Sequence, residues 1–223
     1  MTSPRKVLRL PVIPLVAAAA LAACGGVAGG GEAQTVLNDQ DQARAEAVVV
    51  RASDFPGGWT SARHEQQGAK TCLNPDLSDL TVTGQADSRD FSRQSFTVNS
   101  SATVMRTADE AKTAYERQAT GDLPKCIADQ LGKSIESSSD VAIDVKHAGV
   151  RELDFARLGD RSQAYRATLD LDIGGAAVRA YVDFVFLQRG RTLATLAFAG
   201  IGQAPQQALE EELTARVAGR LGR

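Results

Sequence analysis

Two stretches of alternating apolar and polar residues constrain the fold of this 223-residue chain more than any other feature. In residues 165–173, apolar side chains occupy every second position and polar side chains such as Arg166 lie between them. Residues 178–186 repeat the pattern, with Asp183 at a polar position. A period of two is typical of strands that bury one face, and the Gly174-Gly175 pair between the runs favours a two-residue turn. The sequence therefore predicts an antiparallel hairpin with Arg166 and Asp183 on its polar face.

The segments around this hairpin predict a single α+β domain. Helical spacing of apolar residues, with Asn38 and Thr107 as capping residues, predicts helices over 39–51, 107–120, 124–131 and from Pro205 onward. Strands are expected at 91–106 (one strand or a bent hairpin), 142–150, 152–158 and 193–199, and residues 68–90 are expected to form a long loop. We expect an antiparallel meander flanked by helices.

The overall composition excludes several classes of protein. A chain that is 43% hydrophobic and 23% charged is typical of a globular domain and not of a disordered one. The formal net charge of -2 argues against nucleic-acid binding, which needs a concentrated basic face. With His64 and His147 as the two histidines and no C-x-x-C spacing, we expect no metal site, and no cofactor is indicated.

The first 24 residues have the layout of a secretory signal peptide. Arg5, Lys6 and Arg9 precede an apolar run over 10–20, which is too short to span a bilayer core that needs about 20 apolar residues. Leu21-Ala22-Ala23-Cys24 follows, and this sequence resembles the lipobox of bacterial lipoproteins. The resemblance implies cleavage before Cys24 and a diacylglyceryl group on its thiol. The alternative is an ordinary signal peptide with a chance cysteine.

The lipobox implies a three-part organisation outside the cytoplasm. Residues 1–23 are then the signal peptide, residues 24–37 are a lipidated, glycine-rich tether, and residues 38–223 are the folded domain. Acyl chains hold such a lipoprotein on the cell membrane, because an acidic domain has no attraction to anionic headgroups.

Two cysteines remain once Cys24 is assigned to the lipid. Extracytoplasmic compartments are oxidising, so we predict a disulfide between Cys72 and Cys126. The alternatives are two free thiols or, with less support, a thiol catalyst, since neither cysteine has the setting of a nucleophile.

Catalytic motifs are not evident in the sequence. There is no G-x-S-x-G motif, and polar neighbours around His64 and His147 predict surface histidines rather than members of a triad. Asp170 and Asp172 lie on one strand face, but solvent exposure explains them better than paired catalysis does. We therefore expect a protein that is not an enzyme.

Aromatic side chains are the candidates for ligand contacts. A sheet covered by helices can leave an apolar cleft between its layers, and such clefts are the usual sites for small ligands. Burial in the core is the competing explanation for each aromatic residue. The candidate lining residues are Trp59, Phe96, Tyr165, Tyr181, Phe184, Phe186 and Phe198.

Three turn segments carry a resemblance to a known group of proteins: residues 54–59 (DFPGGW), 159–165 (GDRSQAY) and 185–191 (VFLQRGR). Together with the lipobox and the cysteine pair, they resemble small actinobacterial cell-envelope lipoproteins with sensor-like domains. These domains are similar to the extracellular domain of PknH-like Ser/Thr kinases and to PsbP/Mog1-like folds. The resemblance implies a non-catalytic envelope domain, although the kinase domain has two disulfides where this chain has one cysteine pair.

The sequence supports two main hypotheses for function. The first is a non-catalytic, membrane-anchored sensor or accessory lipoprotein that binds a small amphiphile or an envelope protein. The second is a cell-wall hydrolase or transferase, which predicts a buried polar cluster in a cleft. A purely structural role in the envelope is a third hypothesis.

Overall fold

A computed structural model describes residues 33–64, 76–119, 121, 123–137 and 143–222. Its helices are α2 (Asp39–Val48), α3 (Ala108–Ala119), α4 (Leu123–Ser137) and α5 (Gln207–Leu221). Its strands are β1 (Gln34–Thr35), β2 (Thr60–Ala62), β3 (Thr81–Asp87), β4 (Asp90–Arg93), β5 (Phe96–Met105), β6 (Ile143–Glu152), β7 (Arg161–Ile173), β8 (Ala176–Arg189) and β9 (Thr192–Ile201).

All of these strands belong to one sheet with the order β1-β3-β5-β9-β8-β7-β6. Strands β6 to β9 form the predicted antiparallel meander, and β5 pairs with β9 to join the two halves of the chain. Short strands β2 and β4 extend the β5 side. The sheet is mixed because β1 runs parallel to β3. The α+β class and the single domain expected from the sequence agree with this architecture.

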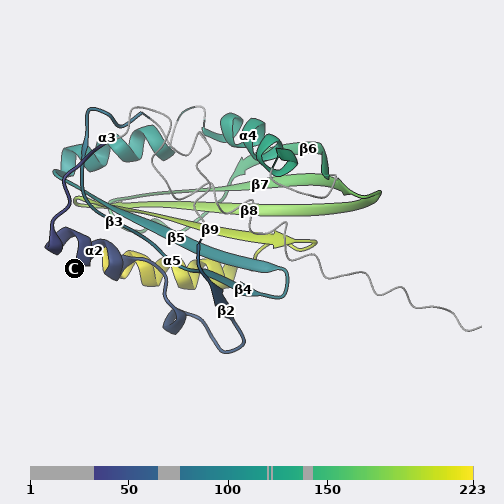
Figure 1. Cartoon of the computed structure of the whole chain (residues 1–223), viewed down its shortest axis with the longest axis horizontal. Coiled ribbons are helices and arrows are strands. Elements are labelled where there is room, and N and C mark those ends of the chain that lie inside the picture. The colour runs from purple at the N-terminus through teal and green to yellow at the C-terminus, as the bar shows by residue number, and fades with distance from the viewer. Residues whose placement is uncertain (1–32, 65–75, 120, 122, 138–142, 223) are drawn as a thin grey trace, which may run out of the picture.

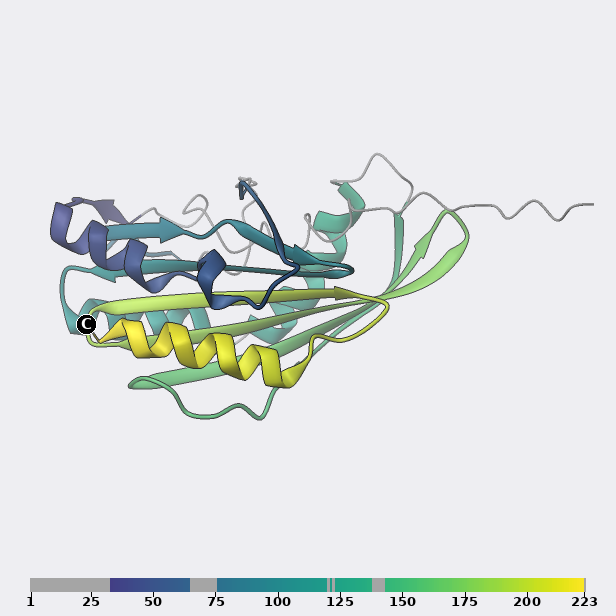
Figure 2. The same cartoon turned by 90° about the horizontal axis from the view of Figure 1, so that it is seen from below.

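Helices cover both faces of the sheet. In Figure 1, α3 and α4 lie above the strands and α2 and α5 lie below them. Figure 2 shows α5 running along the strands beside α2. Each face has its own apolar cluster: Phe184 and Phe186 belong to the cluster under α3 and α4, and Val185 and Leu187 belong to the cluster under α2 and α5. The sheet is therefore the middle of three layers.

The prediction that the hairpin strands are half-buried is wrong in the middle of β8. Residues 182–188 are buried without a break, including Asp183. The cause is α5, which packs across β8 and β9 and covers the face that the alternation left polar. Farther along the hairpin, Asp170 and Arg179 form an ion pair and remain partly or fully exposed, so the prediction holds there.

The turn of the hairpin is confirmed. Ile173 pairs with Ala176, and Gly174 and Gly175 between them have φ values of 59° and 89°. Both angles lie in the region that glycine reaches without a steric penalty, as a two-residue turn of this kind requires.

Several predicted boundaries need correction. The predicted loop 68–90 contains strand β3, and the predicted strand 152–158 keeps only its first residue in a strand. The sequence of strand β3, TVTGQAD, contains one large apolar residue and a glycine, so it lacks the alternation that predicts a strand. Helix α2 crosses this glycine so closely that a Cβ atom on Gly84 would lie 2.2 Å from the carbonyl oxygen of Asp41. That close approach explains why a glycine occupies a buried strand position.

A buried carboxylate joins α2 to the sheet. Asp41 accepts hydrogen bonds from the Arg191 guanidinium at 2.6 and 3.1 Å and from the Thr83 hydroxyl at 2.7 Å. Asn38 caps the helix and donates to the same carboxylate at 3.1 Å. Burial alone would raise the pKa of Asp41, but these hydrogen bonds outweigh burial and lower the pKa to about 2. The ionised carboxylate is therefore bound more strongly in the folded state than in the unfolded state.

Replacement of this carboxylate tests that conclusion. We expect Asp41→Ala to lower the free energy of unfolding at pH 7 by about 2 kcal/mol, because Arg191 loses its partner. Since the pKa is lowered, the contribution of Asp41 is present above 3.8 and is lost as the pH falls toward 2. Urea unfolding of both proteins at pH 7 and at about pH 2.5, close to the lowered pKa, measures the loss of stability and its dependence on pH.

The matched control is Asp39→Ala, which removes an exposed acidic residue from the same helical turn. It should change the free energy of unfolding by no more than about 0.5 kcal/mol. Equal losses in the two variants would show that negative charge in the first turn of the helix, and not the buried ion pair, is responsible.

Candidate ligand-binding site

A cavity of about 280 Å³ lies between α5, β5, β9 and the turn before β2. Trp59, Phe96 and Phe198, three of the seven predicted contact residues, contribute to its walls. The full lining is Pro56, Trp59, Arg93, Gln94, Phe96, Thr97, Val98, Phe198, Ala199, Pro205, Gln206, Leu209 and Glu210. The lining is mostly apolar, and the exposed Arg93 and the buried Glu210 are its charged or titratable members.

The DFPGGW turn positions Trp59. The Trp59 ring packs against Phe55 with a centroid distance of 4.8 Å, and Phe55 stacks on Phe91 of β4 at 4.5 Å. At the start of the turn, Asp54 accepts two hydrogen bonds from Arg220 of α5 at 3.0 and 2.9 Å. The turn is therefore held by an aromatic stack on one side and a buried ion pair on the other.

Strand pairing positions Phe96 and Phe198. Phe96 of β5 lies opposite Gly200 of β9, and a Cβ atom on Gly200 would lie 2.3 Å from the carbonyl oxygen of Gln203 and 3.1 Å from the Phe96 ring. The glycine thus allows the Phe96 ring to lie close to the neighbouring strand. Phe198 is 1% exposed and faces α5. These side chains form the sheet side of the cavity.

A buried polar cluster adjoins the cavity. Asp183 of β8 is fully buried and lies opposite Arg166 of β7, whose guanidinium binds it through two nitrogens, one of them at 2.7 Å. Glu210 of α5 is 1% exposed and reaches the same cluster, with its Oε1 atom 3.7 Å from Arg166. The cluster therefore contains two carboxyl groups and one guanidinium.

The Glu210 carboxyl group is held in its protonated form. Burial, followed by a hydrogen bond and charge repulsion from Asp183, raises the pKa of Glu210 to about 9. At neutral pH Glu210 is thus protonated, and the Arg166–Asp183 pair balances its own charge. Oε1 of Glu210 is buried and has no hydrogen-bond partner among the described residues. Among the described residues, the buried Trp59 Nε1 atom also has no hydrogen-bond partner.

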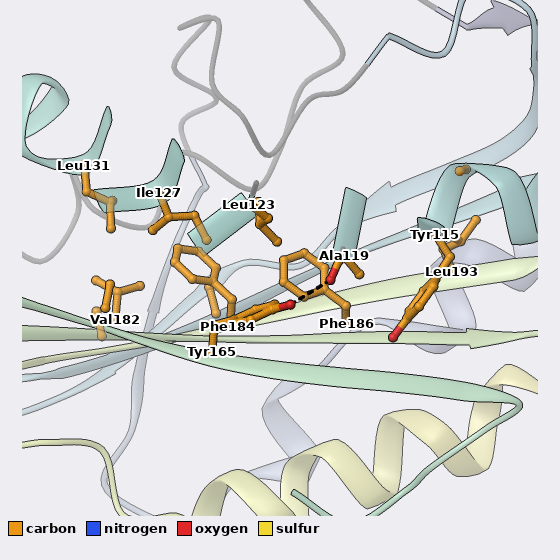
Figure 3. Packing of buried hydrophobic residues seen from close by; sticks show 14 of the residues in the cluster. Tyr115, Ala119, Leu123, Ile127, Leu131, Tyr165, Val182, Phe184, Phe186 and Leu193 are labelled. Carbon is orange, nitrogen blue, oxygen red and sulfur yellow. Dashed lines mark hydrogen bonds between the residues drawn. The ribbon is translucent and has the colours of Figure 1, made fainter. Parts of the chain in front are cut away.

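The other four predicted contact residues do not line this cavity. Tyr165, Phe184 and Phe186 lie on the opposite face of the sheet, packed under α3 and α4 (Figure 3). The Tyr165 hydroxyl donates to the carbonyl oxygen of Ala119 at 3.0 Å. Tyr181 of β8 is half-buried and lies outside the cavity. Core packing is the role that the structure assigns to the first three, so the seven residues do not form one cleft.

The prediction that His64 lies on the surface is wrong. Its side chain is 8% exposed and not on the surface, and its Nδ1 atom lies 2.9 Å from Asp90. Asn99 donates to the same carboxylate at 2.8 Å. The hydrogen bond to Asp90 outweighs burial and raises the pKa of His64. His147 is exposed on β6, as expected.

The lipid and disulfide predictions concern residues outside the described ranges. Cys24 and Cys72 lie there, and Cys126 is half-buried on α4. The predicted bond and the predicted acyl group therefore stay predictions. Within the described residues, no helix has both the length and the apolarity needed to cross a bilayer, and no group of His, Cys, Asp or Glu side chains is arranged to bind a metal ion.

A second hollow, of about 690 Å³, is lined by Tyr115 and by residues 152–155 and 157–164. This segment includes Glu152, Asp154, Arg157, Asp160 and Arg161. Its lining is mostly polar, and of the seven aromatic candidates it contains none. The cavity beside Glu210 is the better candidate for a ligand because it combines apolar walls with a buried polar group.

Comparison with known proteins adds one structural likeness. No family model matches the sequence, and no curated protein matches it. Among solved structures, the chain is similar to the extracellular domain of PknH from Mycobacterium tuberculosis, with 11% identity and a TM-score of 0.44 over 81% of this chain and 96% of that chain. A likeness of this size carries no inference about function.

The protonation of Glu210 has a measurable consequence for stability. Because its pKa is raised, its stabilising effect is complete below the unfolded value near 4.5 and is lost as the pH rises toward 9. Glu210→Gln mimics the protonated form and does not titrate. We expect the free energy of unfolding of the wild type to fall relative to that of E210Q as the pH rises from 5 toward 9, with a slope of up to about 1 kcal/mol per pH unit.

Chemical denaturation of both proteins across this pH range measures the difference. Glu211→Gln, at the exposed position next to Glu210, is the control and should follow the wild type. A constant difference between the wild type and E210Q would mean that Glu210 is ionised in the folded state.

Proposed function

We propose that this protein is a non-catalytic, extracytoplasmic lipoprotein whose domain binds a small amphiphile in the cavity between α5 and the sheet. The observation that carries the proposal is a cavity of about 280 Å³ with a mostly apolar lining and an aromatic wall. An apolar ligand body fits against Trp59, Phe96 and Phe198, and the exposed Arg93 offers the lining a charged group. Few, well-placed polar groups in an apolar cavity are typical of small-molecule sites.

The location at the membrane rests on the N-terminal sequence. The charged leader, the short apolar run and Cys24 support export and lipidation. A lipid-anchored domain beside the bilayer is well placed to receive amphiphiles, because their local concentration is highest there. An envelope protein is the alternative partner, and a sensor or accessory role is compatible with either.

A hydrolase remains the second candidate, because a buried polar cluster does lie beside the cavity. Glu210, with a pKa of about 9, has the protonation state of a general acid. Hydrolysis of a glycoside needs a second carboxylate that reaches the substrate. Asp183 is fully buried, is bound by Arg166 and does not line the cavity. The geometry therefore supports binding better than it supports catalysis.

Occupation of the cavity can be tested with N-phenyl-1-naphthylamine, a neutral fluorescent amphiphile. We expect its emission to increase on mixing with the wild type, because an apolar cavity excludes water. Leu209→Trp fills part of the cavity from α5 and should weaken binding by at least about tenfold, which corresponds to about 1.4 kcal/mol. Fluorescence titration gives both dissociation constants.

The control is Leu77→Trp, a change at a half-buried position that packs against the opposite apolar cluster. It should leave the affinity unchanged. If both variants bind the probe as the wild type does, the cavity is not the binding site, and turnover of envelope substrates becomes the next hypothesis to measure.

The anchor is tested separately. Cys24→Ser removes the thiol that the lipid requires, so we expect no incorporation of radiolabelled palmitate in cells and loss of the mature, membrane-bound form. Cys126→Ser is the control and should be labelled normally. Equal labelling of the wild type and C24S would contradict the lipoprotein assignment.

A further inference from the structure

The side chain of Arg93 stands on the face of the sheet that contains the cavity. Strands β4 and β5 are joined by a two-residue turn, and Arg93 lies directly opposite Phe96 across it. Directly opposed residues of neighbouring strands point to the same side, with Cβ atoms about 5 Å apart. Both residues line the cavity, and a Cβ atom on Gly58 would lie 4.0 Å from Arg93 Nε. The guanidinium is therefore also close to the DFPGGW turn, which contributes Pro56 and Trp59 to the lining.

Arg93 differs from the arginines that hold the α5 side of the fold together. Arg166, Arg191 and Arg220 each bind a buried carboxylate. Arg93 is exposed, and its side chain has no ion pair or hydrogen bond with any other described residue. Solvation is enough to explain such an arginine on an open surface. On the lining of an apolar cavity, it is also a positive charge that is available to a ligand.

Among the described residues that line the cavity, no carboxylate opposes this charge. The other titratable residue of the lining is Glu210, which is protonated at neutral pH because burial and Asp183 raise its pKa to about 9. Glu211 and Glu212 follow it on α5 but do not line the cavity. The lining thus carries one positive charge, which favours a ligand with one negative charge.

The volume of the cavity limits the apolar part of that ligand. A cavity of about 280 Å³ lies just below the usual range of roughly 300–1,000 Å³ for small-molecule sites. With about 30 Å³ for each group of the size of a water molecule, it encloses about nine non-hydrogen atoms. The walls are mostly aromatic and aliphatic, so the enclosed body of the ligand is apolar.

We propose that the cavity binds a monocarboxylate with an apolar body of about eight carbon atoms, and that the Arg93 guanidinium pairs with the carboxylate. This inference rests on the proposed function and adds the chemical class of the ligand. A guanidinium matches a carboxylate in shape and binds it through two parallel N–H donors. One guanidinium balances one carboxylate, whereas a phosphate monoester carries a charge of nearly two units. An ammonium head group is disfavoured because it meets a like charge.

Three probes with the same eight-carbon chain test this ligand class: octanoate, octan-1-ol and octylammonium. At pH 7 the first is an anion, the second is neutral and the third is a cation. Isothermal titration at low salt measures the three affinities for the wild type. We expect octanoate to bind about tenfold more tightly than octylammonium. This preference should decrease in about 0.5 M salt, because an exposed ion pair is screened.

Variants of exposed arginines locate the charge. Arg93→Gln removes the guanidinium, so octanoate should bind at least about fivefold more weakly, whereas octan-1-ol should bind within about twofold of its wild-type affinity. Arg93→Glu reverses the charge and should make octylammonium the tighter ligand. Arg63→Gln is the matched control, because Arg63 is also exposed but does not line the cavity. It should leave the preference for octanoate unchanged.

The outcomes separate this inference from the proposed function. If none of the three probes binds the wild type, the ligand-binding function itself fails. If the probes bind but octylammonium binds as tightly as octanoate, the function stands and the inferred ligand class is wrong. The same conclusion follows if R93Q keeps the preference, or if R63Q loses as much of it as R93Q does. Circular dichroism and thermal unfolding establish that each variant is folded.

Discussion

Burial of both faces of the sheet is the constraint on which the rest of the structure depends. Strands β8 and β9 lie at the centre, and the helices of the two outer layers cover them from opposite sides. The apolar cluster under α2 and α5 draws residues from widely separated parts of the chain, including Ala45 on α2, Val98 on β5 and Leu213 on α5. Because α5 closes this face, every polar group beneath it needs a partner inside the protein.

Three carboxyl groups on this side meet that need in different ways. Asp41 and Asp54 are buried and ionised, and each binds a single arginine, Arg191 or Arg220. Glu210 shares its environment with Asp183, which already has Arg166, so Glu210 keeps a proton instead. The first two ion pairs hold α2, α5 and the DFPGGW turn in place. The third cluster has two carboxyl groups and one guanidinium, and Glu210, which lines the cavity, is the carboxyl group that stays protonated.

The elements of the fold were largely predictable from the sequence, and the site was predictable only in part. Alternation and paired glycines identified the β7–β8 hairpin, and helical spacing identified four helices. Trp59, Phe96 and Phe198 were correct members of the cavity lining, whereas Tyr165, Phe184 and Phe186 belong to the other apolar cluster. An aromatic residue in a strand faces one side or the other of the sheet, and composition alone does not state which side contains a cavity.

The sequence by itself determined which residues share a face of each strand, where the hairpin turns and which residues form the apolar stripe of α5, because these properties depend on local periodicity and on backbone sterics. Only the tertiary structure decided that the polar face of the hairpin is covered. Arg166 and Asp183 occupy positions that a solvated strand also offers, and Glu210 has the sequence position of an ordinary first-turn glutamate. Their burial, the proton on Glu210 and the cavity all arise when a helix from the end of the chain packs against strands that precede it, and no local pattern records that contact.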